Sequence, residues 1–137
     1  MKPTCINVTS GTHTYPVHIA NGLISRLSSL VDQAAPNGKR FIVSNSTVWR
    51  IYGQTISTAL PDAEIILIPD GERFKTLHTV SRIYESLILA GADRQATLVA
   101  VGGGVVGDVA GFAAATFLRG ITILHVPTTL LGQVDSA

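Results

Sequence analysis

The stretch VAVGGGVVGDVAGFAAA, residues 99–115, joins an apolar, strand-like run to three consecutive glycines, a fourth glycine and an aspartate. Gly102, Gly104 and Gly107 match the pattern G-x-G-x-x-G between a predicted strand and a predicted helix. Such glycines let the backbone approach a pyrophosphate, whose charge is attracted by the free N–H groups of a helix start. The alternative interpretation is that they only allow the helix to pack tightly on the strand.

The segments around this stretch repeat one order, strand then helix. Apolar runs at residues 40–44, 64–69, 97–101 and 121–127 predict strands, and the segments 46–60, 76–91, 105–118 and 128–137 predict helices. Alternating strands and helices predict a mostly parallel sheet, and continuous apolar strands are typical of a sheet covered on both faces. A hairpin over residues 4–20 comes first, followed by a helix that Asn21 caps and that ends at Pro36. The sequence therefore predicts an α/β, Rossmann-like fold with helices on both faces of the sheet, preceded by an N-terminal β-hairpin.

The composition sets limits on the function. With 137 residues, 46% apolar and 14% charged, the chain is long enough for one globular domain. Its net charge of +1 and its scattered basic residues give no basis for nucleic acid or a membrane as partner. The first residues lack the apolar core of a signal peptide, so we expect a cytoplasmic protein. The single cysteine, Cys5, excludes an internal disulfide, and we expect its thiol to be half-buried and inert.

Polar residues follow each predicted strand, where ligands bind in sheets of this kind. The usual acid for the ribose, about 20 residues after the glycines, is absent, because that position falls near Pro127. The loop PDGERFK, residues 69–75, offers carboxylates for ribose hydroxyls and Lys75 for a phosphate. Thr128 and Thr129 offer hydroxyl and N–H groups at another helix start. Taken singly, the loop reads as a solvated surface and the threonines as a plain N-cap, but together they favour a dinucleotide site.

The four histidines do not predict a metal centre. His13, His18, His78 and His125 lack the spacing of metal ligands. We therefore expect structural roles for them and no metal-ligand set in this chain.

Three segments, PDGERFK, VAVGGGVVGDVAGFAAATFLRG and VPTTLLGQVDSA, in this order and spacing, resemble 3-dehydroquinate synthase, as does YPVHIANGL near the start. GGGVVGD alone would indicate only the wider superfamily of sugar-phosphate cyclases and glycerol-dehydrogenase-like enzymes. The resemblance implies that residues 1–137 are the N-terminal NAD-binding domain of a homodimeric lyase that requires NAD and a divalent metal, zinc or cobalt. That enzyme converts 3-deoxy-D-arabino-heptulosonate 7-phosphate to 3-dehydroquinate and phosphate in the shikimate pathway of aromatic amino acid biosynthesis.

The resemblance also implies the site residues. The implied NAD-binding residues are Asp70, Gly71, Glu72, Arg73, Phe74, Lys75, Gly103, Gly104, Val105, Val106, Gly107, Asp108, Thr128 and Thr129, with Asn45 and Thr47 toward the adenosine half. The resemblance assigns Asp135 and Arg119 to the sugar-phosphate substrate, Arg119 by reaching into a neighbouring subunit's site. From composition alone, Arg119 would be a surface residue at a helix end.

In the family, a helical domain with the metal-binding glutamate and histidines follows the VDSA-like residues. This sequence lacks it, so we expect a truncated or excised domain that is inactive by itself. Two alternatives remain at this stage: the nucleotide domain of another sugar-phosphate cyclase, or a free-standing dinucleotide-binding module.

Overall fold

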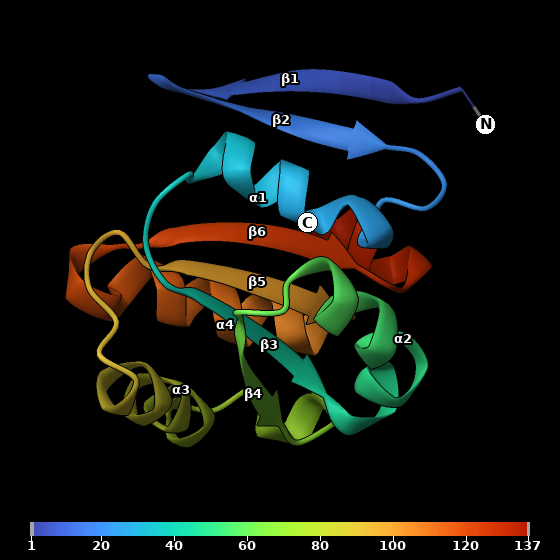
Figure 1. Cartoon of the computed structure of the whole chain (residues 1–137). Helices are drawn as coiled ribbons and strands as arrows, with labels where there is room; N and C mark the ends of the chain where they lie inside the picture. Colours follow the sequence, from blue (N-terminus) through green and yellow to red (C-terminus); the bar gives the residue numbers. More distant parts are fainter. Residues whose placement is uncertain (1, 137) are drawn as a thin grey trace.

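Four parallel strands form the central sheet of the computed structural model, which describes residues 2–136 (Figure 1). They are β3 (Arg40–Asn45), β4 (Glu64–Ile68), β5 (Thr97–Gly102) and β6 (Thr122–Pro127), in the order β4-β3-β5-β6. The chain moves outward from β3 to β4, then returns to place β5 and β6 on the other side of β3. In open α/β sheets, ligands bind at the carboxyl ends of the strands on either side of such a reversal, which here lies between β3 and β5.

The register brings the ends of the strands to one edge of the sheet. Asn45 pairs with Ile68 at the ends of β3 and β4, and Gly102 pairs with Pro127 at the ends of β5 and β6. The polar segments that follow these four strands therefore begin along the same side of the sheet, at the carboxyl ends of the strands.

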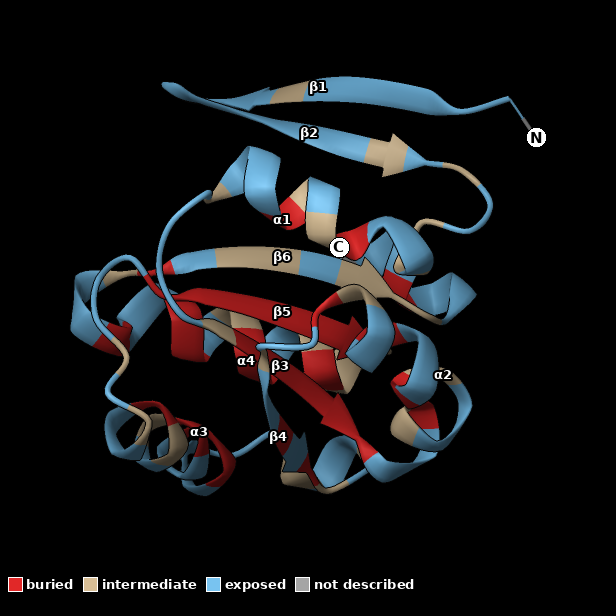
Figure 2. Cartoon of the chain, in the orientation of Figure 1, coloured by how far each residue is buried: buried red, intermediate tan, exposed pale blue. Residues whose placement is uncertain are grey.

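Helices cover both faces of this sheet, as the sequence predicted. On one face lie α1 (Leu27–Ala34) and α2 (Ser46–Ala59); on the other lie α3 (Leu77–Leu89) and α4 (Gly104–Thr116). Alternate residues of β5 enter the two cores, Leu98 and Ala100 on the α3–α4 side, Val99 and Val101 on the α1–α2 side. Residues on both faces of β5 therefore pack against helices, and β5 is buried along its length (Figure 2). This burial on both faces explains why the sequence of β5 is a continuous apolar run.

The N-terminal hairpin forms a second sheet of its own. It consists of β1 (Thr4–Ser10) and β2 (His13–Ile19), joined at Gly11 with φ +59°. Both strands are largely exposed (Figure 2). Cys5 is exposed, so the expectation of a half-buried thiol was wrong. The reason is that the hairpin is not part of the covered parallel sheet.

Two helix boundaries differ from the sequence prediction. The segment after Asn21 begins with a 3-10 turn, η1 (Ile24–Arg26), whose N-cap position is Leu23, so Asn21 does not cap a helix. Helix α4 ends at Thr116 and continues into η3 (Phe117–Arg119). The last described segment, η4 (Gly132–Ser136), is a π-helix.

Within residues 2–136, no helix has both the length and the apolar character to cross a bilayer.

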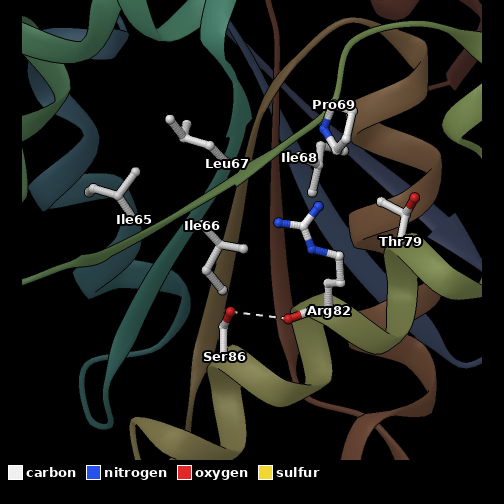
Figure 3. A pocket seen from close by; sticks show the side chains of 8 residues that line it. All are labelled: Ile65, Ile66, Leu67, Ile68, Pro69, Thr79, Arg82 and Ser86. Atoms are coloured by element: carbon white, nitrogen blue, oxygen red, sulfur yellow. Dashed lines mark hydrogen bonds between the residues drawn. The ribbon is translucent and has the colours of Figure 1, made fainter.

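The outer edge of β4 borders a cavity of about 140 Å³ beside α3 (Figure 3). The Arg82 side chain extends from α3 toward Ile66 and Ile68 of this strand. A charged side chain at an open sheet edge discourages pairing with another chain, so we interpret Arg82 as protecting the edge.

Candidate functional site

Asp70, two residues after β4, is linked to the last residue of β3 and to the first turn of α2. Its Oδ1 accepts a hydrogen bond of 3.2 Å from Asn45 Nδ2, and its Oδ2 accepts one of 3.2 Å from Thr47 Oγ1. Asn45 is also the N-cap of α2, because its Oδ1 accepts from the Val48 N–H at 2.8 Å. Asp70 itself is exposed at the edge of the sheet. The ends of the two strands are therefore joined through one carboxylate.

The rest of this loop is shaped by Gly71. Its φ of +116° is a conformation that residues with a Cβ rarely adopt, which explains the glycine after Asp70. The 3-10 turn η2 (Glu72–Phe74) follows, with the Arg73 guanidinium 4.8 Å from the centre of the Phe74 ring. The Thr76 side chain then accepts from the Thr79 N–H and caps α3.

Lys75 connects this loop to the first turns of α4. Its Nζ lies 2.7 Å from Asp108 Oδ2 and 3.1 Å from Glu72 Oε2. These two carboxylates, Asp108 first, raise the pKa of Lys75 above its ordinary value. The side chain is 34% exposed, so the ammonium is held in place while remaining open to solvent.

The glycine turn after β5 serves both packing and access. A Cβ at Gly102 would lie 2.6 Å from the Val106 side chain, so this glycine is required for α4 to fold back on the strand. Gly103, the N-cap of α4, has the Thr129 side chain close by, 3.2 Å from where its Cβ would be. Because Gly103 has no side chain to cap the helix, the N–H groups of the first turn remain for another acceptor. The structure thus assigns tight packing to Gly102 and an uncapped helix start to Gly103.

Val106 in the first turn of α4, Thr128 after β6 and Gly132 in η4 surround the glycine turn in different ways. Val106 is 1% exposed and packs in the core, so only its backbone can meet a ligand. The Thr128 N–H donates to the Gly102 carbonyl at 2.9 Å, which ties the end of β6 to the glycine turn. Gly132, at the start of η4, lies beside the same turn, since its Cβ would be 3.5 Å from the Gly104 nitrogen.

The two predicted substrate residues lie differently. Asp135 is exposed in η4, which packs against α4. Arg119 follows the far end of α4, a helix of 13 residues and about 20 Å long, so the structure does not bring it to the glycine turn of its own chain. Leu118 and Arg119 have φ values of +48° and +69°. Consecutive left-handed residues other than glycine are strained, and strain of this kind often marks functional sites.

His125, for which a structural role was expected from the sequence, lies near the glycine turn. Its imidazole rests on α4, where a Cβ at Gly111 would lie 3.5 Å from its Cε1. This burial lowers the pKa of His125, and the nearby Asp108 carboxylate opposes the shift. No sequence spacing indicated this contact, because it depends on the packing of α4 against β6.

Within residues 2–136, no three His, Cys, Asp or Glu side chains come together as a metal site would require. The described residues therefore offer cations, N–H groups and hydroxyls for a phosphate-bearing ligand, and do not offer a metal-binding set.

The sheet order and the glycine turn at its carboxyl edge define a Rossmann-like α/β domain. The family model described as 3-dehydroquinate synthase N-terminal matches residues 65–137, and the chain belongs to this family. The family resemblance seen in the sequence is thus confirmed.

Curated relatives match nearly the whole chain. It is 44% identical over 136 residues to the 3-dehydroquinate synthase of Pelotomaculum thermopropionicum, covering 96% of this chain and 37% of that protein. It is 47% identical over 141 aligned residues to that of Syntrophotalea carbinolica, covering 100% of this chain and 39% of that protein. The chain therefore spans less than two fifths of the length of these relatives.

A solved structure of a sugar-phosphate cyclase has the same fold. It is 2-deoxy-scyllo-inosose synthase complexed with carbaglucose-6-phosphate, NAD+ and Co2+, at 30% identity and a TM-score of 0.83. The match covers 97% of this chain and 38% of that one. This similarity confirms the predicted fold, including the hairpin that precedes the sheet.

Proposed function

We propose that this chain is the N-terminal NAD-binding domain of a cytoplasmic 3-dehydroquinate synthase, a carbon–oxygen lyase of the shikimate pathway. The whole enzyme would convert 3-deoxy-D-arabino-heptulosonate 7-phosphate to 3-dehydroquinate and phosphate. Membership of the family and relatives of that name at 44% and 47% identity support this proposal. Another sugar-phosphate cyclase is the second candidate, but the similar cyclase structure is only 30% identical.

The observation that carries the proposal is the chemistry gathered at the carboxyl edge of the sheet. The Lys75 ammonium, bonded to Asp108, stands next to a helix start that has no side-chain cap. A cation and free N–H groups suit a pyrophosphate, and the exposed carboxylate of Asp70 suits ribose hydroxyls. This set of donors and acceptors fits NAD, the cofactor in the similar cyclase structure.

Each part of the chain would then have one task. Backbone N–H groups from Gly103 to Val106 and the Thr128–Thr129 turn would hold the pyrophosphate, with Lys75 neutralising its charge, while the Gly107 N–H donates to the Gly103 carbonyl. The loop from Asp70 to Phe74 would hold the ribose, and the glycine turn would keep side chains out of the way. When bound, NAD would supply a hydride acceptor for the transient oxidation of the substrate.

The metal and most of the substrate site would belong to the remainder of a longer protein. The described residues contain no group of side chains that could hold a metal ion. Asp135 would meet the substrate from η4. Arg119, about 20 Å from the glycine turn along α4, would serve the neighbouring subunit of a homodimer.

Titration calorimetry with NAD tests the cofactor site directly. The unmodified chain should bind NAD, and Gly104→Val should remove that binding while circular dichroism shows a folded protein. The reason is that a branched side chain at the first residue of α4 would occupy the approach to its N–H groups. Unchanged NAD affinity in the folded variant would contradict the assignment.

A further inference from the structure

We propose that Asn45 and Thr47 are positioning residues that fix the Asp70 carboxylate, and that this arrangement selects NAD over NADP. The inference rests on the proposed function and deepens it, since it assigns the choice of nucleotide to particular atoms. We use the name carboxylate clamp for the three residues Asn45, Thr47 and Asp70.

The first step is that both polar atoms of the Asn45 side chain already form hydrogen bonds within the protein. Its side-chain oxygen accepts from Val48 N–H, its side-chain nitrogen donates to Asp70, and the residue is 5% exposed. An amide so engaged has little surface left for a dinucleotide. Asn45 therefore acts through Asp70, in place of the direct contact with the adenosine half that the sequence led us to expect.

The second step concerns the two oxygens of Asp70. Each receives one donor, from Asn45 on Oδ1 and from Thr47 on Oδ2, at 3.2 Å in both cases. A carboxylate oxygen has two acceptor sites, so each keeps one for a further donor. Two adjacent ribose hydroxyls can donate to such a pair, one to each oxygen. A 2′-phosphate brings negative charge and no second donor, so the same carboxylate repels it.

The third step is the contrast with Glu72, the other carboxylate of the loop. The Glu72 side chain is 77% exposed and forms an ion pair with Lys75 at 3.1 Å. Lys75 also holds Asp108, at the shorter distance of 2.7 Å. Glu72 is therefore held by one exposed ion pair, whereas Asp70 is oriented by two donors, Asn45 at the end of β3 and Thr47 in the first turn of α2. We assign the discrimination to Asp70.

The test measures the affinities for NAD and NADP in parallel. Thr47→Val removes one donor to Asp70 and keeps the shape of the side chain. It should lower NAD affinity by about 3- to 10-fold, the effect of one ordinary hydrogen bond, and change NADP affinity by less than about 2-fold. Thr47→Ser keeps the hydroxyl and should restore the preference for NAD. Thr58→Val is the matched control, since the Thr58 hydroxyl donates to the Gln54 carbonyl in its own helix.

A second variant addresses Asn45 without removing the helix cap. Asn45→Asp retains an acceptor for the Val48 N–H but places a second carboxylate against Asp70. It should weaken NAD binding more than Thr47→Val does, while α2 stays folded by circular dichroism. An NAD-to-NADP ratio that is the same in the unmodified chain, Thr47→Val and Asn45→Asp would overturn the carboxylate clamp alone. Absence of NAD binding in the unmodified chain would instead overturn the proposed function and the clamp with it.

Discussion

Lys75 connects the loop after β4 to the first turns of α4. Its ammonium contacts Glu72 within the loop and Asp108 on the helix. Exposed ion pairs contribute little to folding, so this arrangement is better explained by a ligand than by stability. The raised pKa keeps the ammonium charged throughout the neutral range and beyond pH 10.5.

Replacing Lys75 therefore separates binding from folding. Lys75→Met should lower NAD affinity at least about 10-fold, the cost of losing a charged contact to a phosphate, and leave the midpoint of thermal unfolding nearly unchanged. Lys39→Met is the control, because Lys39 bonds to the Ala90 carbonyl, away from the site. A large loss of thermal stability with unchanged NAD affinity would show that Lys75 has a structural role.

His125 predicts how stability depends on pH. Burial against α4 lowers its pKa in the folded state below the ordinary 6.5. Between the two values the unfolded chain binds more protons than the folded chain, so stability rises with pH and falls as the pH drops below 6.5. His125→Gln should reduce this loss. The free energy of unfolding, measured with urea from pH 7.5 to 5, tests this. The same dependence on pH in the unmodified protein and in His125→Gln would contradict the assignment.

At the scale of the elements, the turn between β5 and α4 is decided by packing as well as by ligand access. A Cβ at Gly102 would lie 2.6 Å from Val106, whereas one at Gly111 would lie 3.5 Å from His125, an ordinary contact. The same substitution at these two glycines of one segment should thus have opposite effects.

Gly102→Ala should destabilise the fold by about 1–3 kcal/mol, the usual cost of overpacking a core. Gly111→Ala, in the middle of α4, should stabilise it by about 0.5–1 kcal/mol, since alanine is the better helix former. Urea unfolding of both variants provides the measurement. If Gly102→Ala were neutral, α4 would have to pack more loosely on β5 than the structure indicates.

The same segment illustrates what a sequence can and cannot predict. The apolar run and the glycines of residues 99–115 predicted the strand, the turn and the helix, because these features depend on local pattern. The contact of Lys75 with Asp108 was not predictable, because it joins two elements whose approach depends on the packing of α4. The left-handed conformations of Leu118 and Arg119 carry no local signal either, since neither is a glycine.

For the whole molecule, the distribution of exposed apolar residues is the main unexplained feature. In the hairpin, Ile6 pairs with Val17 and Tyr15 with Val8, and Ile6, Tyr15 and Val17 are 48%, 51% and 38% exposed. Leu130 and Val134, near η4, are each 74% exposed. Together they make self-association at high concentration the expected behaviour of this chain.

The last prediction is that this chain binds NAD weakly and does not turn over its substrate. The carboxyl edge of the sheet provides pyrophosphate and ribose contacts, so NAD should raise the midpoint of thermal unfolding. Turnover needs more, because holding reactants in attack geometry contributes about 7–11 kcal/mol to lowering a barrier. The described residues hold no metal-ligand set, and the chain spans 37–39% of its curated relatives.

The assay is release of phosphate from 3-deoxy-D-arabino-heptulosonate 7-phosphate, with NAD and zinc added to the purified chain of 137 residues. An intact relative serves as the positive control, and light scattering reports self-association in the same samples. We expect thermal protection by NAD and no phosphate release. Turnover close to that of the intact relative would mean that the reacting groups lie in this chain after all, and would require a different active site from the one proposed.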